Sequence, residues 1–185
     1  KNNLKKTDNL LVYYAGHGIF NKETEVGYWQ PINGKPKNET EWISNYRVET
    51  ILKEIKANNI MIIADACHSG SIFRYKGNIS EEQKNQSKIE RFKRDVEKKT
   101  RVALTSGGNE PVLDNVNGEK HSVFARAFLN ILDDNRSILT ATNLSEEIKE
   151  KTIAILKKYG VKQTPEFSHL HRSGHDGGDF LFVPR

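Results

Sequence analysis

The chain has 185 residues, of which 36% are hydrophobic and 29% are charged, and these values suit one folded domain with a core. No apolar run approaches the roughly 18 residues that span a membrane, and the first residues do not resemble a secretory signal. The single cysteine excludes an internal disulfide framework and a cysteine-based zinc cluster. We therefore expect one domain over residues 1–185, in the cytoplasm and without a membrane partner.

The net charge of +5 is concentrated in one segment. Residues 74–101 hold ten Lys/Arg against five Asp/Glu, and the rest of the chain balances at nineteen of each sign. The excess therefore belongs to a polar stretch and not to a basic face spread over the fold. We expect residues 74–100 to form a polar, basic linker within the domain. A nucleic-acid-binding domain is the competing class, favoured only by the pI of about 9.2, and we expect no nucleic-acid partner.

The first third of the chain predicts a strand, a helix and a second strand. Residues 9–16 have the apolar character of a buried strand that leads to His17, and residues 19–42 are polar and predict a long irregular excursion along one wall of a cleft. A helix is predicted from residue 44 or 45 to about residue 58, with apolar side chains at 48, 51, 52 and 55. Residues 60–66 follow as a strand. Such a βαβ unit pairs its strands in parallel through a right-handed crossover.

The remaining elements complete an α/β pattern. Residues 74–100 show almost no apolar periodicity, so they predict either a solvated helix or disorder. Residues 101–106 predict a third strand, and residues 122–133 predict a helix. Another helix begins near residue 143 or 145, and residues 179–183 predict the last strand. The helix over 122–133 should bury its apolar residues, which are Val123, Phe124, Ala127, Phe128, Ile131 and Leu132.

Two reactive residues stand where predicted strands end. Cys67 lies in the run 62–70 (IIADACHSG), and His17 lies in the run 11–18 (LVYYAGHG). Parallel strands carry such residues to the carboxyl edge of a sheet, where a thiol and an imidazole can act as nucleophile and acid/base partner. The alternatives are a buried apolar role for Cys67 and a turn or core role for His17. Glycines beyond both residues favour catalysis, because they let backbone N–H groups approach a substrate carbonyl.

Residues 13–18 (YYAGHG) and 65–70 (DACHSG) closely resemble the His and Cys motifs of the caspase-like cysteine peptidases, in particular metacaspases and their bacterial relatives, the orthocaspases. A His about 50 residues before the Cys is also a caspase signature. Residues 104–114 (LTSGGNEPVLD), 121–128 (HSVFARAF) and 174–184 (GHDGGDFLFVP) are similar to later parts of bacterial members. The resemblance spans nearly the whole chain. It implies a caspase-like three-layer sandwich, with a mostly parallel sheet and helices on both faces.

The chain departs from that family at its start. Caspase-like folds usually have a strand, a helix and a second strand before the strand that carries the His motif, and here only eight residues precede that strand. Without those elements a six-stranded sheet would lose two strands and expose its flank. We therefore expect an N-terminally incomplete domain, completed by a longer chain or by a partner chain. A smaller fold that never had those strands is the alternative.

The resemblance implies roles for the motif residues. Cys67 is the expected nucleophile and His17 the expected acid/base group, with the backbone N–H groups of Gly18 and Cys67 as the oxyanion hole. His68 matches a non-catalytic His of the motif.

An acidic S1 pocket is also expected. Asp65 shares a face with Cys67, since residues two apart in a strand point the same way. A carboxylate there favours Arg or Lys before the cleaved bond, as in metacaspases. The alternative is a carboxylate that caps a nearby loop. Glu110 and Asp114 are weaker candidates for the same pocket.

The expected activity is therefore that of a cysteine endopeptidase acting on proteins or peptides. In caspase-like proteins the connection after the nucleophile strand is commonly where self-cleavage occurs, so we expect processing after a Lys or Arg between Arg74 and Arg101. The alternative is a catalytically silent caspase-fold scaffold or partner-binding module. We expect no metal or other cofactor. Many relatives are activated by a fused sensor domain, a partner or calcium, and this sequence has no recognisable calcium loop.

Overall fold

A computed structural model describes residues 3–72, 97–108, 112–113 and 118–184. Its main sheet has four strands in the order β1-β5-β6-β8. Strands β1, β5 and β6 run parallel, and β8 runs antiparallel to β6. The predicted strands over 9–16, 60–66 and 101–106 are therefore confirmed within one residue, whereas β8 was not predicted. The bounds are β1 Asn9–Ala15, β5 Asn59–Asp65, β6 Thr100–Thr105 and β8 Glu166–His169.

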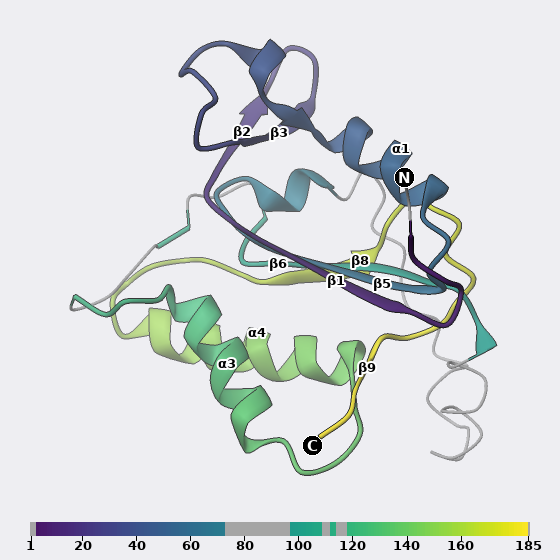
Figure 1. The fold of residues 1–185 in the computed structure, drawn as a ribbon. Coiled ribbons are helices and arrows are strands. Elements are labelled where there is room, and N and C mark those ends of the chain that lie inside the picture. The colour runs from purple at the N-terminus through teal and green to yellow at the C-terminus, as the bar shows by residue number, and fades with distance from the viewer. Residues whose placement is uncertain (1–2, 73–96, 109–111, 114–117, 185) are drawn as a thin grey trace.

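Helices cover both faces of this sheet, which confirms the α/β fold class. Figure 1 shows α1 (Asn45–Glu54) on one face, and α3 (Val123–Asp134) and α4 (Ala141–Lys157) on the other. Strand β5 serves both layers, because its side chains alternate between the faces. Ile60 and Ile62 pack with the α1 side, and Met61 and Ile63 pack with α3 and α4.

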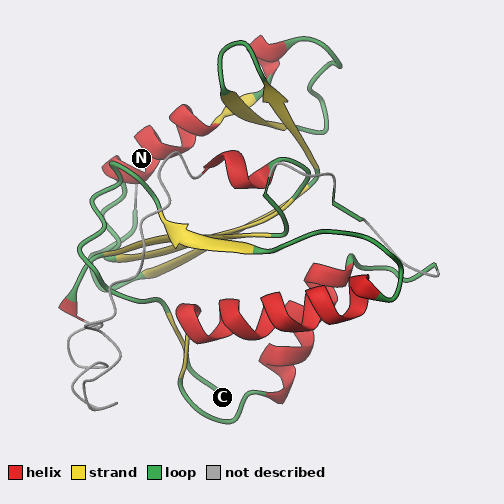
Figure 2. Ribbon diagram, turned by 180° about the vertical axis from the view of Figure 1, so that it is seen from behind, coloured by secondary structure: helices red, strands yellow, loops and turns green. Residues whose placement is uncertain are grey.

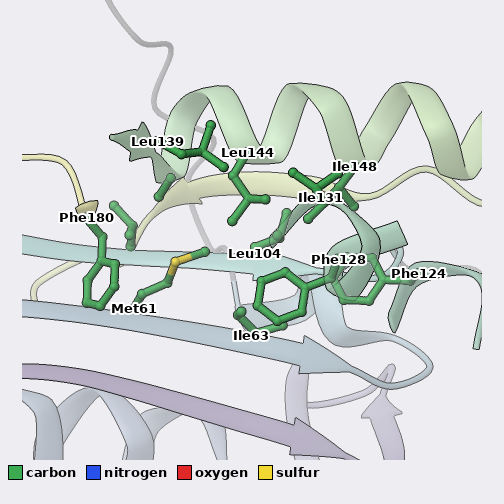
Figure 3. Packing of buried hydrophobic residues seen from close by; sticks show 12 residues of the cluster. Met61, Ile63, Leu104, Phe124, Phe128, Ile131, Leu139, Leu144, Ile148 and Phe180 are labelled. Carbon is green, nitrogen blue, oxygen red and sulfur yellow. The ribbon is translucent and has the colours of Figure 1, made fainter. Parts of the chain in front are cut away.

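The larger core lies between the sheet and the α3–α4 pair. Figure 3 shows Met61, Ile63 and Leu104 beneath the apolar side chains of the two helices. Each fully buried aliphatic side chain contributes roughly 2 kcal/mol by leaving water. The helical residues of this core include Phe124, Phe128, Ile131, Leu144 and Ile148.

The helices α1, α3 and α4 each begin at a hydroxyl residue. The side chains of Ser44, Ser122 and Thr140 accept hydrogen bonds from the backbone N–H groups of residues 47, 125 and 143. Such caps stabilise a helix by about 1 kcal/mol. Helix α1 ends earlier than predicted, and its buried face differs from the prediction. Ile51 is 48% exposed, whereas Glu49 is buried.

The segment that follows His17 is more regular than the sequence predicted. The excursion over 19–42 contains most of a three-stranded antiparallel sheet, with β2 (His17–Asn21), β3 (Val26–Gln30) and β4 (Ile43–Ser44). The prediction failed because the turn lacks a glycine signal. Instead, the Asn21 side chain accepts hydrogen bonds from the N–H groups of residues 23 and 24. Figure 2 shows this small sheet extending from the main sheet on the side of α1.

The short elements complete the description. They are the 3₁₀ turns η1 (Glu39–Glu41) and η2 (Ser69–Ile72) and the antiparallel pair β7 (Leu139–Thr140) and β9 (Leu181–Phe182). The strand predicted over 179–183 is thus only two residues long and does not join the main sheet. Of the linker predicted over 74–100, residues 74–96 lie outside the described residues, and Thr100 begins β6.

Strand β1 borders the main sheet. Within the described residues it pairs only with β5, and Leu11 and Tyr13 are 42% and 44% exposed. Of the helices that the structure describes, none is long and apolar enough to cross a membrane.

Candidate active site

The register of β1 and β5 brings the two reactive motifs to neighbouring positions. Ala15 pairs with Asp65 at the carboxyl ends of these parallel strands. The Gly16 N–H then donates to the Asp65 carbonyl at 3.3 Å. His17 and Cys67 each lie two residues beyond this last pair. The expectation that both residues come to one edge of the sheet is therefore met by the backbone.

Beyond that edge the two segments touch at Gly18. A methyl group added to Gly18 would overlap the Cys67 carbonyl oxygen, so only glycine fits against this peptide. The position of Gly18 relative to the Cys67 segment is thus fixed by a close contact between their backbones. This contact explains the glycine that follows His17 in the sequence.

Tyr14 holds the corner at which β1 becomes β2. Its ring stacks on Trp29 with centroids 4.5 Å apart, and the single proton of its hydroxyl is shared between the carbonyls of His17 at 2.8 Å and Gln30 at 3.1 Å. Burial raises the pKa of Tyr14, so the hydroxyl keeps its proton for these bonds. His17 opens β2 opposite Gln30, and its side chain is exposed. The imidazole of His17 is therefore open to solvent, while the main chain that carries it is held by hydrogen bonds.

Cys67 is half-buried, and its sulfur has a hydrogen-bond donor. The backbone N–H of Val112, in the loop that follows β6, lies 3.3 Å from Cys67 Sγ. His68 then adopts a left-handed backbone with φ of 54°, which is uncommon for a non-glycine residue. The N–H and the hydroxyl of Ser71 both donate to the His68 carbonyl, at 3.1 and 2.6 Å. The sharp turn after the cysteine is therefore held by local bonds.

The same turn is fastened to the end of β6. The Gly70 N–H donates to the Gly108 carbonyl at 3.1 Å, and the Ser69 hydroxyl donates to the Gly107 carbonyl at 3.2 Å. A side chain at position 70 would come within 2.6 Å of the Gly108 α-carbon. The small residues of the turn after Cys67 and of the loop after β6 thus permit these two segments to pack backbone against backbone.

Asp65 joins three elements of the fold. The Ser122 hydroxyl, which caps α3, donates to Asp65 Oδ2 at 2.5 Å. Burial, the charge of Asp65 and a hydrogen bond to its carboxylate raise the pKa of Tyr13 to about 12. The carboxylate also lies by the N-terminus of α3, where negative charge is favourable. Asp65 remains partly exposed.

Sequence reasoning did not identify Tyr13, Ser122 or Val112 as parts of this site. Ser122 had a readable signal, because it directly precedes a predicted helix. Tyr13 had one too, since it lies on the same face of the sheet as Asp65, one strand away. Val112 had none, because a backbone donor leaves no trace in residue type. Glu110 and Asp114 lie outside the described residues.

The arrangement suits covalent chemistry. A thiol with a nearby amide donor, an exposed imidazole and an acidic side chain gather at the carboxyl edge of a mostly parallel sheet. Within the described residues no group of three or more His, Cys, Asp or Glu side chains could hold a metal ion. An α/β sandwich with this edge is the architecture of a caspase-like cysteine peptidase.

Comparison with protein families gives the same class. The family model of the caspase domain matches residues 1–173. The chain therefore belongs to the caspase domain family of cysteine peptidases, and a protein or peptide substrate follows from that membership. A search of curated proteins found no match to this chain.

Proposed function

We propose that this protein is a cysteine endopeptidase that uses Cys67 and His17 and cleaves after Arg or Lys. The observation that carries the proposal is the β1–β5 register, which pairs Ala15 with Asp65 and so sets the ends of both motifs side by side. The resemblance of the two motifs points to a metacaspase-like enzyme of bacterial type. A cytoplasmic location is part of the same proposal, supported by the single cysteine.

The proposed reaction runs through an acyl-enzyme. The Cys67 thiolate attacks the scissile carbonyl carbon, and a C–S bond forms as the carbonyl becomes an oxyanion. Backbone N–H groups of Gly18 and Cys67 would stabilise that oxyanion, by about 3 kcal/mol for each donor. His17 donates a proton to the leaving amine as the C–N bond breaks. It then takes a proton from water, which hydrolyses the thioester and releases Cys67.

Asp65 would select the residue before the cleaved bond. Asp65 is partly exposed, so a cationic side chain of a substrate could approach its carboxylate. A guanidinium could pair with it by charge-assisted hydrogen bonds. The competing interpretation is a structural tie among β1, β5 and α3. We keep Glu110 and Asp114 as proposed secondary contributors to the same pocket.

A substrate panel tests the specificity. Fluorogenic peptides with Arg, Lys, Asp or Leu before the cleaved bond should be hydrolysed only when that residue is Arg or Lys. Cys67→Ala and His17→Ala should abolish hydrolysis. His171→Ala is the matched control, because it removes an imidazole near the opposite edge of the sheet. Cleavage after Asp, or hydrolysis retained without His17, would refute the assignment, and no cleavage by any variant would favour the silent scaffold.

Self-processing is proposed for the basic segment. Arg101 is a poor target because it is fully buried and lies within β6. We therefore narrow the expected cut to the nine Lys/Arg from Arg74 to Lys99. Intact-mass spectrometry of the active protein should show two fragments, and Cys67→Ala should show one uncut chain. Identical masses would reject self-processing.

A further inference from the structure

Gln163 links the loop after β6 to the end of that strand. Gln163 is 2% exposed, and along the chain it belongs to the connection between α4 and β8. The amide Nε2 donates to the Ser106 carbonyl at 2.7 Å, and Oε1 accepts from the Leu113 N–H at 3.0 Å. Both ends of the amide are therefore in use. A buried side chain with two satisfied backbone bonds is held in one orientation.

Ser106 extends this link to the nucleophile strand. Its hydroxyl accepts a hydrogen bond from the Ala66 N–H at 3.1 Å, and its own N–H donates to the Ala64 carbonyl at 2.9 Å. Ser106 is fully buried. The residue just before Cys67 and the residue just after Val112 are thus attached to one frame, made of Ser106 and Gln163.

This frame aligns the sulfur with its donor. Leu113, held by Gln163, directly follows Val112, whose N–H lies 3.3 Å from Cys67 Sγ. A hydrogen bond from an amide favours the charged form of its acceptor, and the thiolate is the reactive form of cysteine. Without Gln163 the Leu113 N–H would lose its partner, and the loop would be free to leave the sulfur.

We propose that Gln163 is a positioning residue that keeps the Val112 N–H on the Cys67 sulfur and so maintains a reactive thiolate. The proposal rests on the proposed function only in calling Cys67 the nucleophile. Gln163 itself touches neither the sulfur nor a substrate. Its contribution passes through the loop that it holds.

The test measures the thiol itself. The chain has one cysteine, so the rate of alkylation by iodoacetamide reports on Cys67 alone. Gln163→Met keeps the length of the side chain and removes both bonds. We expect alkylation at pH 7 to slow by about tenfold, the effect of losing a hydrogen bond to a charged group. At pH 10 a free cysteine is already a thiolate, so the rates of the two proteins should agree within about twofold.

A further variant separates positioning from general loss of stability. Ser173→Ala removes a comparable buried bond, from a 1% exposed hydroxyl to the Leu170 carbonyl, near the opposite edge of the sheet. It should leave alkylation unchanged. If Gln163→Met does not fold, Gln163→Asn replaces it, because its shorter amide cannot span Ser106 and Leu113.

Several results would overturn the proposal. They are an unchanged rate in Gln163→Met, an equal loss in Ser173→Ala, or an equal deficit at pH 7 and pH 10. Faster alkylation of Gln163→Met would show instead that the loop covers the sulfur. Alkylation requires no peptide hydrolysis, so its outcome is independent of the substrate panel. An inactive wild type with a Gln163-dependent thiol would sink the proposed function and leave this inference standing.

Discussion

Polar side chains differ in burial between the two edges of the main sheet, the amino edge, where the parallel strands begin, and the carboxyl edge, where they end. At the amino edge, the fully buried Arg101 donates to the carbonyls of Ile55, Ala57, Asn58 and Thr100 over 2.7–3.2 Å. These bonds fix the connection between α1 and β5. At the carboxyl edge, His17 is exposed and Cys67 and Asp65 are only partly buried.

This difference separates structural from reactive groups. The Nη groups of this buried cation are occupied by backbone carbonyls, and its Nε is buried without a hydrogen-bond partner among the described residues, so the guanidinium is closed to a ligand from solvent. An exposed imidazole and a half-buried thiol on a tightly bonded backbone keep their capacity for chemistry. The packing of the carboxyl edge comes from glycines and serines, which fix the main chain while His17 stays exposed and Cys67 half-buried.

Among changes that keep both reacting side chains, Gly18→Ala should produce the largest loss of activity. The added methyl group would overlap the Cys67 carbonyl oxygen, so the segments of His17 and Cys67 must separate. A displacement of about 1 Å between reacting groups costs roughly a hundredfold in rate, which sets the expected fall in kcat/KM. Gly118→Ala is the control for a strained glycine: a methyl group there meets nothing within 4 Å, and its left-handed backbone (φ 75°) costs stability without a contact to either motif. Equal activity in the two variants would contradict the contact.

Arg101→Met should produce the largest loss of stability at the other edge. Four carbonyls would lose their donor while the connection after α1 stays buried. We expect the free energy of unfolding to fall by about 3 kcal/mol, measured by urea denaturation. Activity per folded molecule should remain within about twofold. A stable but inactive variant would show that the amino edge serves catalysis.

The amino edge should also respond to acid. Burial, with His169 and Arg101 nearby, lowers the pKa of His175 from 6.5 to about 4, against the opposing effect of Asp176. Its Nδ1 accepts from the Arg101 N–H at 3.2 Å, and its ring stacks on His169. A His with a lowered pKa stabilises the fold fully above pH 6.5, and this contribution is lost as the pH falls toward 4.

The expected acid loss is about 1–2 kcal/mol, after allowance for solvent screening of a partly exposed group. Thermal unfolding at pH 7.5, 5.5 and 4.5 measures it. His175→Gln should flatten this pH dependence, while His121→Gln should leave it unchanged. An equally steep profile in His175→Gln would rule out this residue as the cause.

Ser122→Ala should have the smallest effect and the most specific one. It removes the α3 cap, which costs about 1 kcal/mol of stability, and the donor to Asp65. We expect KM for Arg substrates to rise by about fivefold with kcat nearly unchanged, since the reacting groups are not touched. Ser44→Ala removes the α1 cap and is the matched control. A similar KM change in both variants would reduce Asp65 to a structural tie.

The sequence predicted the parts of this molecule that depend on local periodicity. The apolar runs that precede His17 and Cys67 predicted β1 and β5, and the helix over 122–133 was predicted within one residue. Strand β8 and the small sheet after His17 were missed. Strand β8 has four residues, and the turn before β3 depends on the Asn21 side chain. Such features arise from tertiary pairing and leave weak local patterns.

The candidate site divides in the same manner. Cys67, His17 and Asp65 carry their chemistry in the side chain, so residue type and spacing pointed to them. The contribution of Val112 is a backbone N–H, and Gln163 acts from 96 residues beyond Cys67 in the chain. Neither could be inferred without the folded register. The sequence therefore indicates which groups react, and the structure indicates how they are held.

Labelling with an arginyl chloromethyl ketone tests the joint action of the three side chains most directly. The account predicts that the reagent modifies Cys67 in the wild type, that His17→Ala and Asp65→Asn lose this labelling, and that His171→Ala retains it. Intact-mass spectrometry would record the adduct. Labelling that persists at the wild-type rate without both His17 and Asp65 would contradict the account.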